Sequence, residues 1–153
     1  MKSTANFYSL NKSQNLHLSV CFLARKLYKT GCRIVIIDVD DNLEKIDKLL
    51  WTFEQNSFLP HKIYKSDTCF DTPIILVSAT YPDKKSIFDK YDSIVNIYEK
   101  PVIGKIDDKS IYEFVENIEN KKEMSRKKYI LYKNNNFVLN HKEFNEQRRN
   151  FNI

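Results

Sequence analysis

The chain has 153 residues, of which 25 are Lys or Arg and 20 are Asp or Glu, so its formal net charge is +5 at pH 7. This length predicts one domain, and the 42% of hydrophobic residues suffices for a buried core and is too high for a disordered chain. Only two glycines are present, Gly31 and Gly104. Glycine-rich phosphate loops are therefore excluded, because they need several glycines within a few residues.

The cysteines and histidines are too scattered for a zinc motif, since no CxxC or HExxH spacing occurs among them. They are Cys21, Cys32 and Cys69, and His17, His61 and His141. An odd number of separated cysteines without a signal peptide predicts buried thiols in a reducing cytoplasm. No apolar run approaches the roughly 20 residues of a membrane-spanning helix. We therefore expect a cytoplasmic protein with no metal and no cofactor.

The first part of the chain predicts a strand, a helix and a central strand. Residues 5–10 form a short segment with aromatic side chains, which predicts a strand, and a polar, turn-like stretch follows at 11–15. The next apolar residues recur at spacings of three and four and predict a helix that ends at Gly31, where a left-handed cap belongs. These residues are Leu16, Val20, Leu23 and Leu27. Residues 33–39 form a continuous β-branched run, typical of a strand covered on both faces.

The middle of the chain continues the alternation of strands and helices. Asp40, Asp41 or Asn42 is expected to cap a second helix. Its apolar stripe consists of Leu43, Ile46, Leu49, Leu50 and Phe53. An extended segment at 58–63 and strands at 73–78 and 93–98 follow. This alternation predicts an α/β fold with three layers, α/β/α, and a mostly parallel sheet of four or five strands.

The last part of the chain predicts a long helix that begins at Asp107 or Asp108 and continues or restarts through Met124 to Tyr132. Its inward residues are expected to be Ile111, Phe114, Val115 and Ile118. The window 121–133 holds six basic residues and one acidic residue, so the rest of the chain is neutral. Residues 141–153 are polar and are expected to form a frayed tail after a single domain at 1–140.

An acidic cluster lies at the carboxyl end of the predicted central strand, where open α/β sheets bind ligands. Its members are Asp38, Asp40 and Asp41. They raise the alternative of a magnesium site like that of phosphorelay receivers, and residues 78–80 and 100–101 resemble later receiver positions. A receiver needs a further strand with a phosphoacceptor Asp, and only residues 58–72 are available for it. We favour a helix cap on a solvated loop and assign no catalytic residue.

Two surface features have competing interpretations. Trp51, with Phe58, Leu59 and Pro60 in the following loop, either closes the rim of the core or forms an apolar docking patch. The basic segment 121–133 is either a solvated helix face, a weak nucleic-acid site with interleaved tyrosines, or a site for an acidic peptide end. For the last of these, Arg126 and Tyr129 lie three residues apart and supply a guanidinium and an aromatic ring on one helical face.

Five blocks of sequence, taken together, resemble the chi subunit of bacterial DNA polymerase III. They include an aromatic opening, a Leu-Trp pair followed by Ser-Phe-x-Pro-His, and a Tyr-rich end. The blocks are 6–10, 23–34, 47–53, 56–61, and 129–132 with 137–140. The resemblance spans residues 5–140, nearly the whole chain.

The resemblance implies an accessory protein of the clamp-loader complex, with a nucleotide-binding-like α/β fold that lacks a nucleotide site. Members of that family pair with the psi subunit and hold the acidic, Phe-terminated tail of single-stranded-DNA-binding protein. By position, the psi interface consists of Trp51, Phe58, Leu59 and Pro60. The tail-binding residues are Lys122, Arg126 and Tyr129, together with Lys128 and Lys133. The last two are included because Ile130 stands where the family has a Lys, so another residue has to supply that charge. Direct binding of single-stranded nucleic acid by 121–133 is the alternative function.

Overall fold

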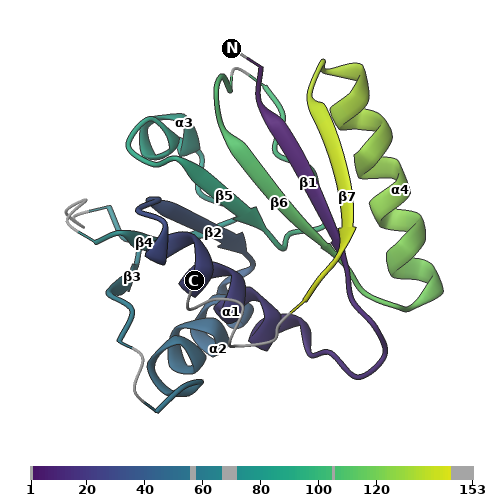
Figure 1. Cartoon of the computed structure of the whole chain (residues 1–153). Helices are drawn as coiled ribbons and strands as arrows, with labels where there is room; N and C mark the ends of the chain where they lie inside the picture. The colour runs from purple at the N-terminus through teal and green to yellow at the C-terminus, as the bar shows by residue number, and fades with distance from the viewer. Residues whose placement is uncertain (1, 56–57, 67–71, 105, 146–153) are drawn as a thin grey trace.

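The computed structural model describes residues 2–55, 58–66, 72–104 and 106–145. Within them, seven strands form one parallel sheet in the order β3–β4–β2–β5–β6–β1–β7, and four helices flank it (Figure 1). The strands are β1 (Thr4–Ser9), β2 (Ile34–Asp38), β3 (His61–Ile63), β4 (Ile74–Ser78), β5 (Ser93–Asn96), β6 (Ser110–Val115) and β7 (Val138–Glu143). The helices are α1 (Leu16–Lys29), α2 (Asp40–Thr52), α3 (Lys84–Phe88) and α4 (Glu119–Asn134). The predicted α/β class is confirmed.

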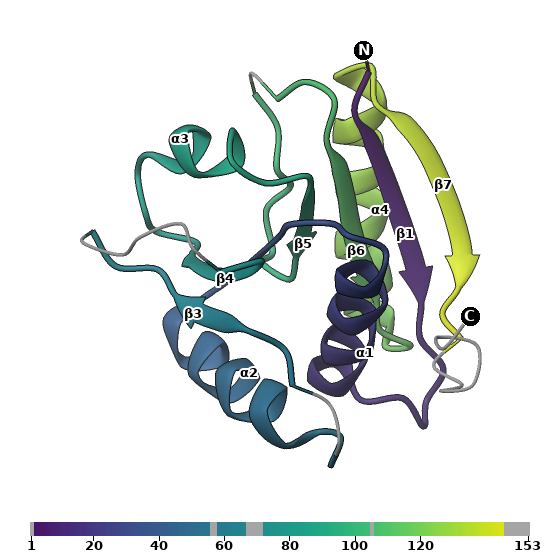
Figure 2. The same cartoon turned by 60° about the vertical axis from the view of Figure 1, so that its left-hand side comes forward.

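The helices cover both faces of the sheet, so the predicted three layers are also confirmed. One core lies beneath α1 and α2 and includes Leu23, Ile36 and Leu50. The other core lies beneath α3 and α4 and includes Phe88 and Tyr132. Figure 2 shows α1 and α4 on opposite faces of the sheet. The continuous apolar runs of β2 and β4 are explained by this arrangement, because their side chains alternate between the two cores.

Both ends of α1 follow the sequence closely. Asn15 is the N-cap, and its side-chain oxygen accepts a hydrogen bond from the backbone N–H of Leu18 at 2.9 Å. At the other end, Gly31 has a φ of +88°. Its N–H donates to the carbonyl of Tyr28, and the N–H of Cys32 donates to the carbonyl of Leu27. This pair of bonds is the Schellman motif, in which glycine avoids the cost of a positive φ.

The sequence prediction was wrong for residues 110–115, which form strand β6 and not the start of a helix. Ile111 and Glu113 face α4, whereas Tyr112 and Phe114 face the core beneath α1. The apolar residues of this segment fit a spacing of two as well as a spacing of three and four, so periodicity alone does not decide between them. Neighbouring strands decide, because β6 pairs in parallel with β5 and β1 and occupies the gap between them.

The sheet is larger than predicted, with seven strands in the described residues instead of four or five. The additional strands are β6, the three-residue β3 and the edge strand β7. β7 pairs in parallel with β1 and extends through His141 to Glu143, so ordered structure passes the expected boundary at residue 140. Residues 146–153, the rest of the predicted tail, lie outside the described residues.

The environment of the cysteines agrees with the prediction only in part. Cys21 is buried in α1, and its burial raises the pKa of its thiol to about 12. Cys32 is partly exposed, which corrects the expectation of a buried thiol there. Cys69 lies outside the described residues. Among the helices that the structure describes, none is long and apolar enough to span a membrane.

Candidate functional site

Helix α4 is attached to the sheet through a buried polar network. The ammonium of Lys128 donates to Oε1 of Glu113 at 2.8 Å and to the carbonyl oxygen of Tyr98. The hydroxyl of Tyr132 donates to Oε2 of Glu113 at 2.7 Å and accepts from the backbone N–H of Val102 at 3.0 Å. Glu113, Lys128 and Tyr132 are all buried. Because each bond has a defined direction, the network fixes both the position and the rotation of α4.

The electrostatics of this network follow from its burial. Burial raises the pKa of Glu113, and the Lys128 ammonium, followed by the hydrogen bonds from Tyr132 and Asn96, opposes that rise. Burial also raises the pKa of Tyr132 far above its usual value, and the Glu113 carboxylate adds to the rise. Lys128, one of the predicted tail-binding residues, is therefore occupied inside the protein and does not reach the outer surface of α4.

A groove of about 590 Å³ lies between the outer flank of α4 and the carboxyl ends of β1, β6 and β7. Three of the predicted tail-binding residues line it: Lys122, Arg126 and Tyr129. The other lining residues are Phe7, Ser9, Val115, Ser125, Ile130 and His141. The structure thus brings two of the four predicted cations and the predicted aromatic ring to one site.

The groove combines an apolar lining with positive charge. Tyr129 is partly exposed, and its ring packs against the buried Phe7 with 5.4 Å between the centroids. Lys122 and Arg126 lie one helical turn apart along the same side of α4. Neither side chain forms an ion pair with any residue in the described part of the chain. Both cations are therefore available to an anionic ligand.

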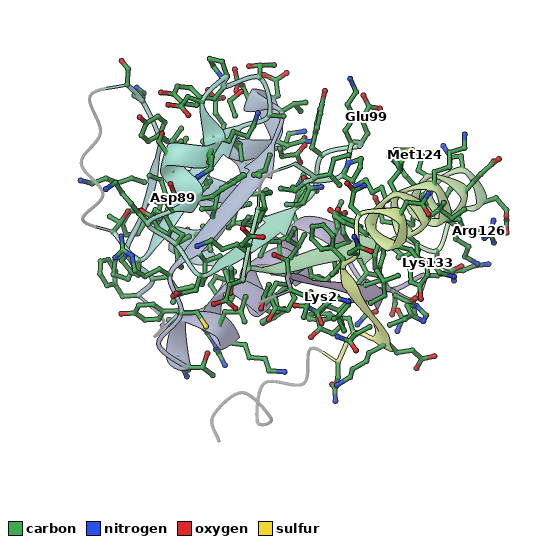
Figure 3. The ribbon with its side chains drawn as sticks, turned by 90° about the horizontal axis from the view of Figure 1, so that it is seen from above. Lys2, Asp89, Glu99, Met124, Arg126 and Lys133 are labelled. Carbon is green, nitrogen blue, oxygen red and sulfur yellow. The ribbon has the colours of Figure 1, made fainter. Side chains whose placement is uncertain are left out.

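Two predicted residues lie outside this groove, and several unpredicted ones lie within it. Lys133 is exposed one turn beyond Tyr129. Neither Lys133 nor the buried Lys128 lines the groove. In Figure 3, Arg126 and Lys133 lie away from Glu99, whereas Met124 lies toward it. Phe7, Ser9, Val115 and His141 come from three strands, and no motif links them to α4 in the sequence. Only the strand order, with β6, β1 and β7 side by side, brings these residues beside α4.

The predicted apolar patch is formed chiefly by two aromatic side chains. Trp51 is 50% exposed at the end of α2, and Phe58 is 67% exposed in the next loop, with 5.6 Å between their ring centroids. Trp51 also packs on the buried ring of His61 at 4.3 Å. Leu59 is 2% exposed and belongs to the core, and Pro60 is partly buried. Leu59 therefore supports the patch from beneath and does not contribute to its surface.

A second hollow, of about 710 Å³, lies at the carboxyl ends of β2, β5 and β6 and on the other flank of α4. Asp38 lines it, but its carboxylate is buried and accepts from the N–H of Val39 and from Asn42. Asp40 and Asp41 are exposed in the first turn of α2, whose N-cap is Val39 without a side-chain cap. The prediction that Asp40, Asp41 or Asn42 caps this helix is therefore wrong. No cluster among the described residues has the composition of a metal site.

These features define a class: a doubly wound α/β domain that lacks a phosphate loop and presents a basic, apolar groove beside its last helix. A family model for the DNA polymerase III chi subunit, HolC, matches residues 1–140. The chain belongs to the family of DNA polymerase III chi subunits. A curated relative from Haemophilus influenzae, named DNA polymerase III subunit chi, is 26% identical over 103 residues, which are 65% of this chain and 69% of that protein. Family membership indicates an accessory role in DNA replication.

Proposed function

We propose that this chain captures the acidic C-terminal tail of single-stranded-DNA-binding protein and links that protein to the clamp loader of DNA polymerase III. In this role it acts as a binding subunit and not as a catalyst. The observation that carries the proposal is the juxtaposition, in one groove, of an apolar lining with two cations that have no ion-pair partner among the described residues. The proposal deepens the replication role that the family indicates.

The groove has the chemistry that such a tail requires. A peptide that ends in Phe presents one ring, a terminal carboxylate and neighbouring Asp side chains. The ring needs an apolar surface, which Phe7, Tyr129 and Ile130 provide. The carboxylates need donors of positive charge, and the Arg126 guanidinium can form two parallel hydrogen bonds to one of them. Lys122 then faces the remaining acidic groups as a flexible point charge.

The expected binding is weak and sensitive to salt. The contact is small, and both cations lie at the protein surface, where salt screens their attraction. We expect a micromolar Kd, equivalent to about −8 kcal/mol. Tethering through the rest of the polymerase assembly raises the effective concentration of the tail, so a modest contact is sufficient and still easily broken and remade.

The test is titration with an acidic peptide that ends in Phe. We expect Arg126→Ala to weaken its binding about tenfold or more, because a charge-assisted hydrogen bond contributes about 1.5–3 kcal/mol. Lys127→Ala is the matched control, since Lys127 is an exposed cation on the same helix that does not line the groove. We expect at most a twofold change for this control, through the general field of the helix. Equal binding by the wild type and Arg126→Ala would remove Arg126 from the site.

Direct binding of single-stranded nucleic acid by 121–133 remains the alternative function. The buried pairing of Lys128 leaves five basic side chains of this segment for phosphates, and each phosphate contact adds about 0.7 to the salt slope for single strands. A labelled oligonucleotide distinguishes the two functions when it is titrated at low and moderate salt. Tight binding of the oligonucleotide, with no binding of the peptide, would favour the alternative.

We further propose that the Trp51–Phe58 pair is the contact for a psi subunit, with Pro60 at its border and Leu59 as support. Exposed aromatic pairs of this kind are typical anchors of protein interfaces. Pull-down from native lysate with the wild type and with Trp51→Ala tests this, because loss of an anchor commonly costs 2 kcal/mol or more. We expect the variant to lose the psi partner and to retain the tail peptide.

A further inference from the structure

The wall of the groove opposite α4 is formed by strands, and it carries one side chain that can become charged. His141 lies on β7 and pairs in register with Phe7 of β1, so the two side chains emerge on the same face of the sheet. That face is the one covered by α4, since Phe7 packs against Tyr129 and Tyr132. His141 is exposed and lines the groove together with Lys122 and Arg126. The groove is thus bordered by two fixed cations on one side and by an imidazole on the other.

The position of His141 is set by Ser9, at the end of β1. The imidazole Nε2 lies 2.6 Å from the Ser9 hydroxyl oxygen, within hydrogen-bond distance. Ser9 is two residues after Phe7 and therefore points to the same face. The ring is in this way held at the open edge of the groove with its polar edge toward the cavity lining, and it is not a freely rotating surface histidine.

We infer that His141 is a specificity-determining residue that contacts the terminal carboxylate of the bound peptide and couples peptide binding to proton uptake. The inference rests on the proposed function and names one further residue of the same site. It concerns a side chain for which the sequence offered no signal, because residues 141–153 were expected to form a frayed tail.

The direction of the coupling follows from the charges that face His141. From α4 these are Lys122 and Arg126, with the neutral phenol of Tyr129, while Ser9 and Phe7 of β1 and Val115 of β6 carry no charge. On β7 itself, Glu143 emerges on the same face two residues later. A peptide carboxylate placed between these cations and the imidazole favours a positive charge on the ring, so peptide binding stabilises its protonated form.

Calorimetric titration of the whole chain at pH 6 and pH 8 tests this inference. The carboxylates of the peptide stay ionised over that range, so they do not contribute to a difference. We expect the wild type to bind the Phe-terminated peptide roughly three- to tenfold more tightly at pH 6, because linked uptake of one proton changes affinity by at most tenfold per pH unit. Titration in two buffers of different ionisation enthalpy then measures the number of protons taken up, which we expect to be between zero and one.

Three variants and one altered peptide make the result specific. His141→Gln removes the charge, and we expect it to bind with the pH 8 affinity of the wild type at both pH values. His141→Lys supplies a permanent charge, and we expect tighter binding without this pH dependence. His17→Gln is the matched control, since His17 lines the other hollow, and we expect it to retain the wild-type pH dependence. A peptide with an amidated C-terminus is expected to lose the pH dependence along with the terminal charge.

The outcomes separate this inference from the proposed function. If no protein binds the peptide at either pH, the proposed function fails. If the wild type and His141→Gln bind with the same pH dependence, the proposed function stands and the role of His141 is overturned. Retention of the full pH dependence by the amidated peptide would also overturn it, because the terminal carboxylate would then not be the group that His141 contacts.

Discussion

Helices α1 and α4 cover opposite faces of the same sheet and are held there by different forces. The buried residues of α1 are mostly apolar, from Val20 to Leu27, and they merge with the larger core. In α4 the buried residues are Lys128 and Tyr132, which are bonded to Glu113. A helix anchored by a few directional bonds thus keeps most of its other side chains at the surface. This leaves the groove residues of α4 free to bind a ligand.

The largest loss of stability is expected when the carboxylate at the centre of the α4 network is removed. We expect Glu113→Ala to lower the free energy of unfolding by about 3–5 kcal/mol, because it leaves the Lys128 ammonium buried without its partner charge. Urea denaturation followed by circular dichroism measures this loss. Glu123→Ala, an exposed change on α4, is the control, and we expect a change within about 0.5 kcal/mol.

Replacing both members of the ion pair separates the cost of an unpaired charge from the loss of packing. The double variant Glu113→Leu with Lys128→Met has no buried charge, and we expect it to be more stable than Glu113→Ala. A double variant that is no more stable than the single one would show that the unpaired Lys128 ammonium is not the cause of the loss in Glu113→Ala. α1 also has a buried ion pair, between Arg25 and Glu54, but this pair joins α1 to the segment that follows α2 and not to a strand of the sheet.

Removal of the Tyr132 hydroxyl is expected to lower the free energy of unfolding by a smaller amount. Tyr132→Phe keeps the ring against Phe7 and Phe137 but removes the donor to Glu113 and the acceptor for the Val102 N–H. We expect a loss of about 1–3 kcal/mol, since the Val102 N–H then lacks this acceptor and the Glu113 carboxylate keeps only its bonds from Lys128 and Asn96. The melting temperature measures the loss of stability, and the affinity for the Phe-terminated peptide shows separately whether the groove is disturbed. An unchanged melting temperature would mean that water replaces the hydroxyl at no cost.

The smallest effects are expected at the first residues of the two helices. Asn15 caps α1 with its side chain, whereas the N-cap of α4 is Ile118, which provides no such bond. We expect Asn15→Ala to cost about 1 kcal/mol and Ile118→Asn to gain about 0.5–1 kcal/mol. Paired thermal melts measure both changes. A loss of stability in Ile118→Asn would indicate that the half-exposed isoleucine has a packing role that outweighs the cap.

The groove was predictable only on its helical wall. Lys122, Arg126 and Tyr129 lie at helical spacings in one basic segment, so the sequence and the family resemblance both indicate them. Lys128 lies in the same segment with the same charge, and nothing in its neighbours distinguishes it from an exposed lysine. Its burial depends on Glu113, which was itself expected to lie on a helix.

The α/β class, helix α1 with its end at Gly31, and the buried strands β2 and β4 were predictable from the sequence, because local periodicity and capping residues act over short distances. Long-range contacts in the folded chain determine that residues 110–115 form a strand, that Lys128 points inward, and that His141 meets Ser9 at the groove. Each of these depends on a partner that is distant along the chain, from 15 residues for Glu113 and Lys128 to 132 for Ser9 and His141. Pairing across such distances is set by the order of the strands, and local sequence does not encode that order.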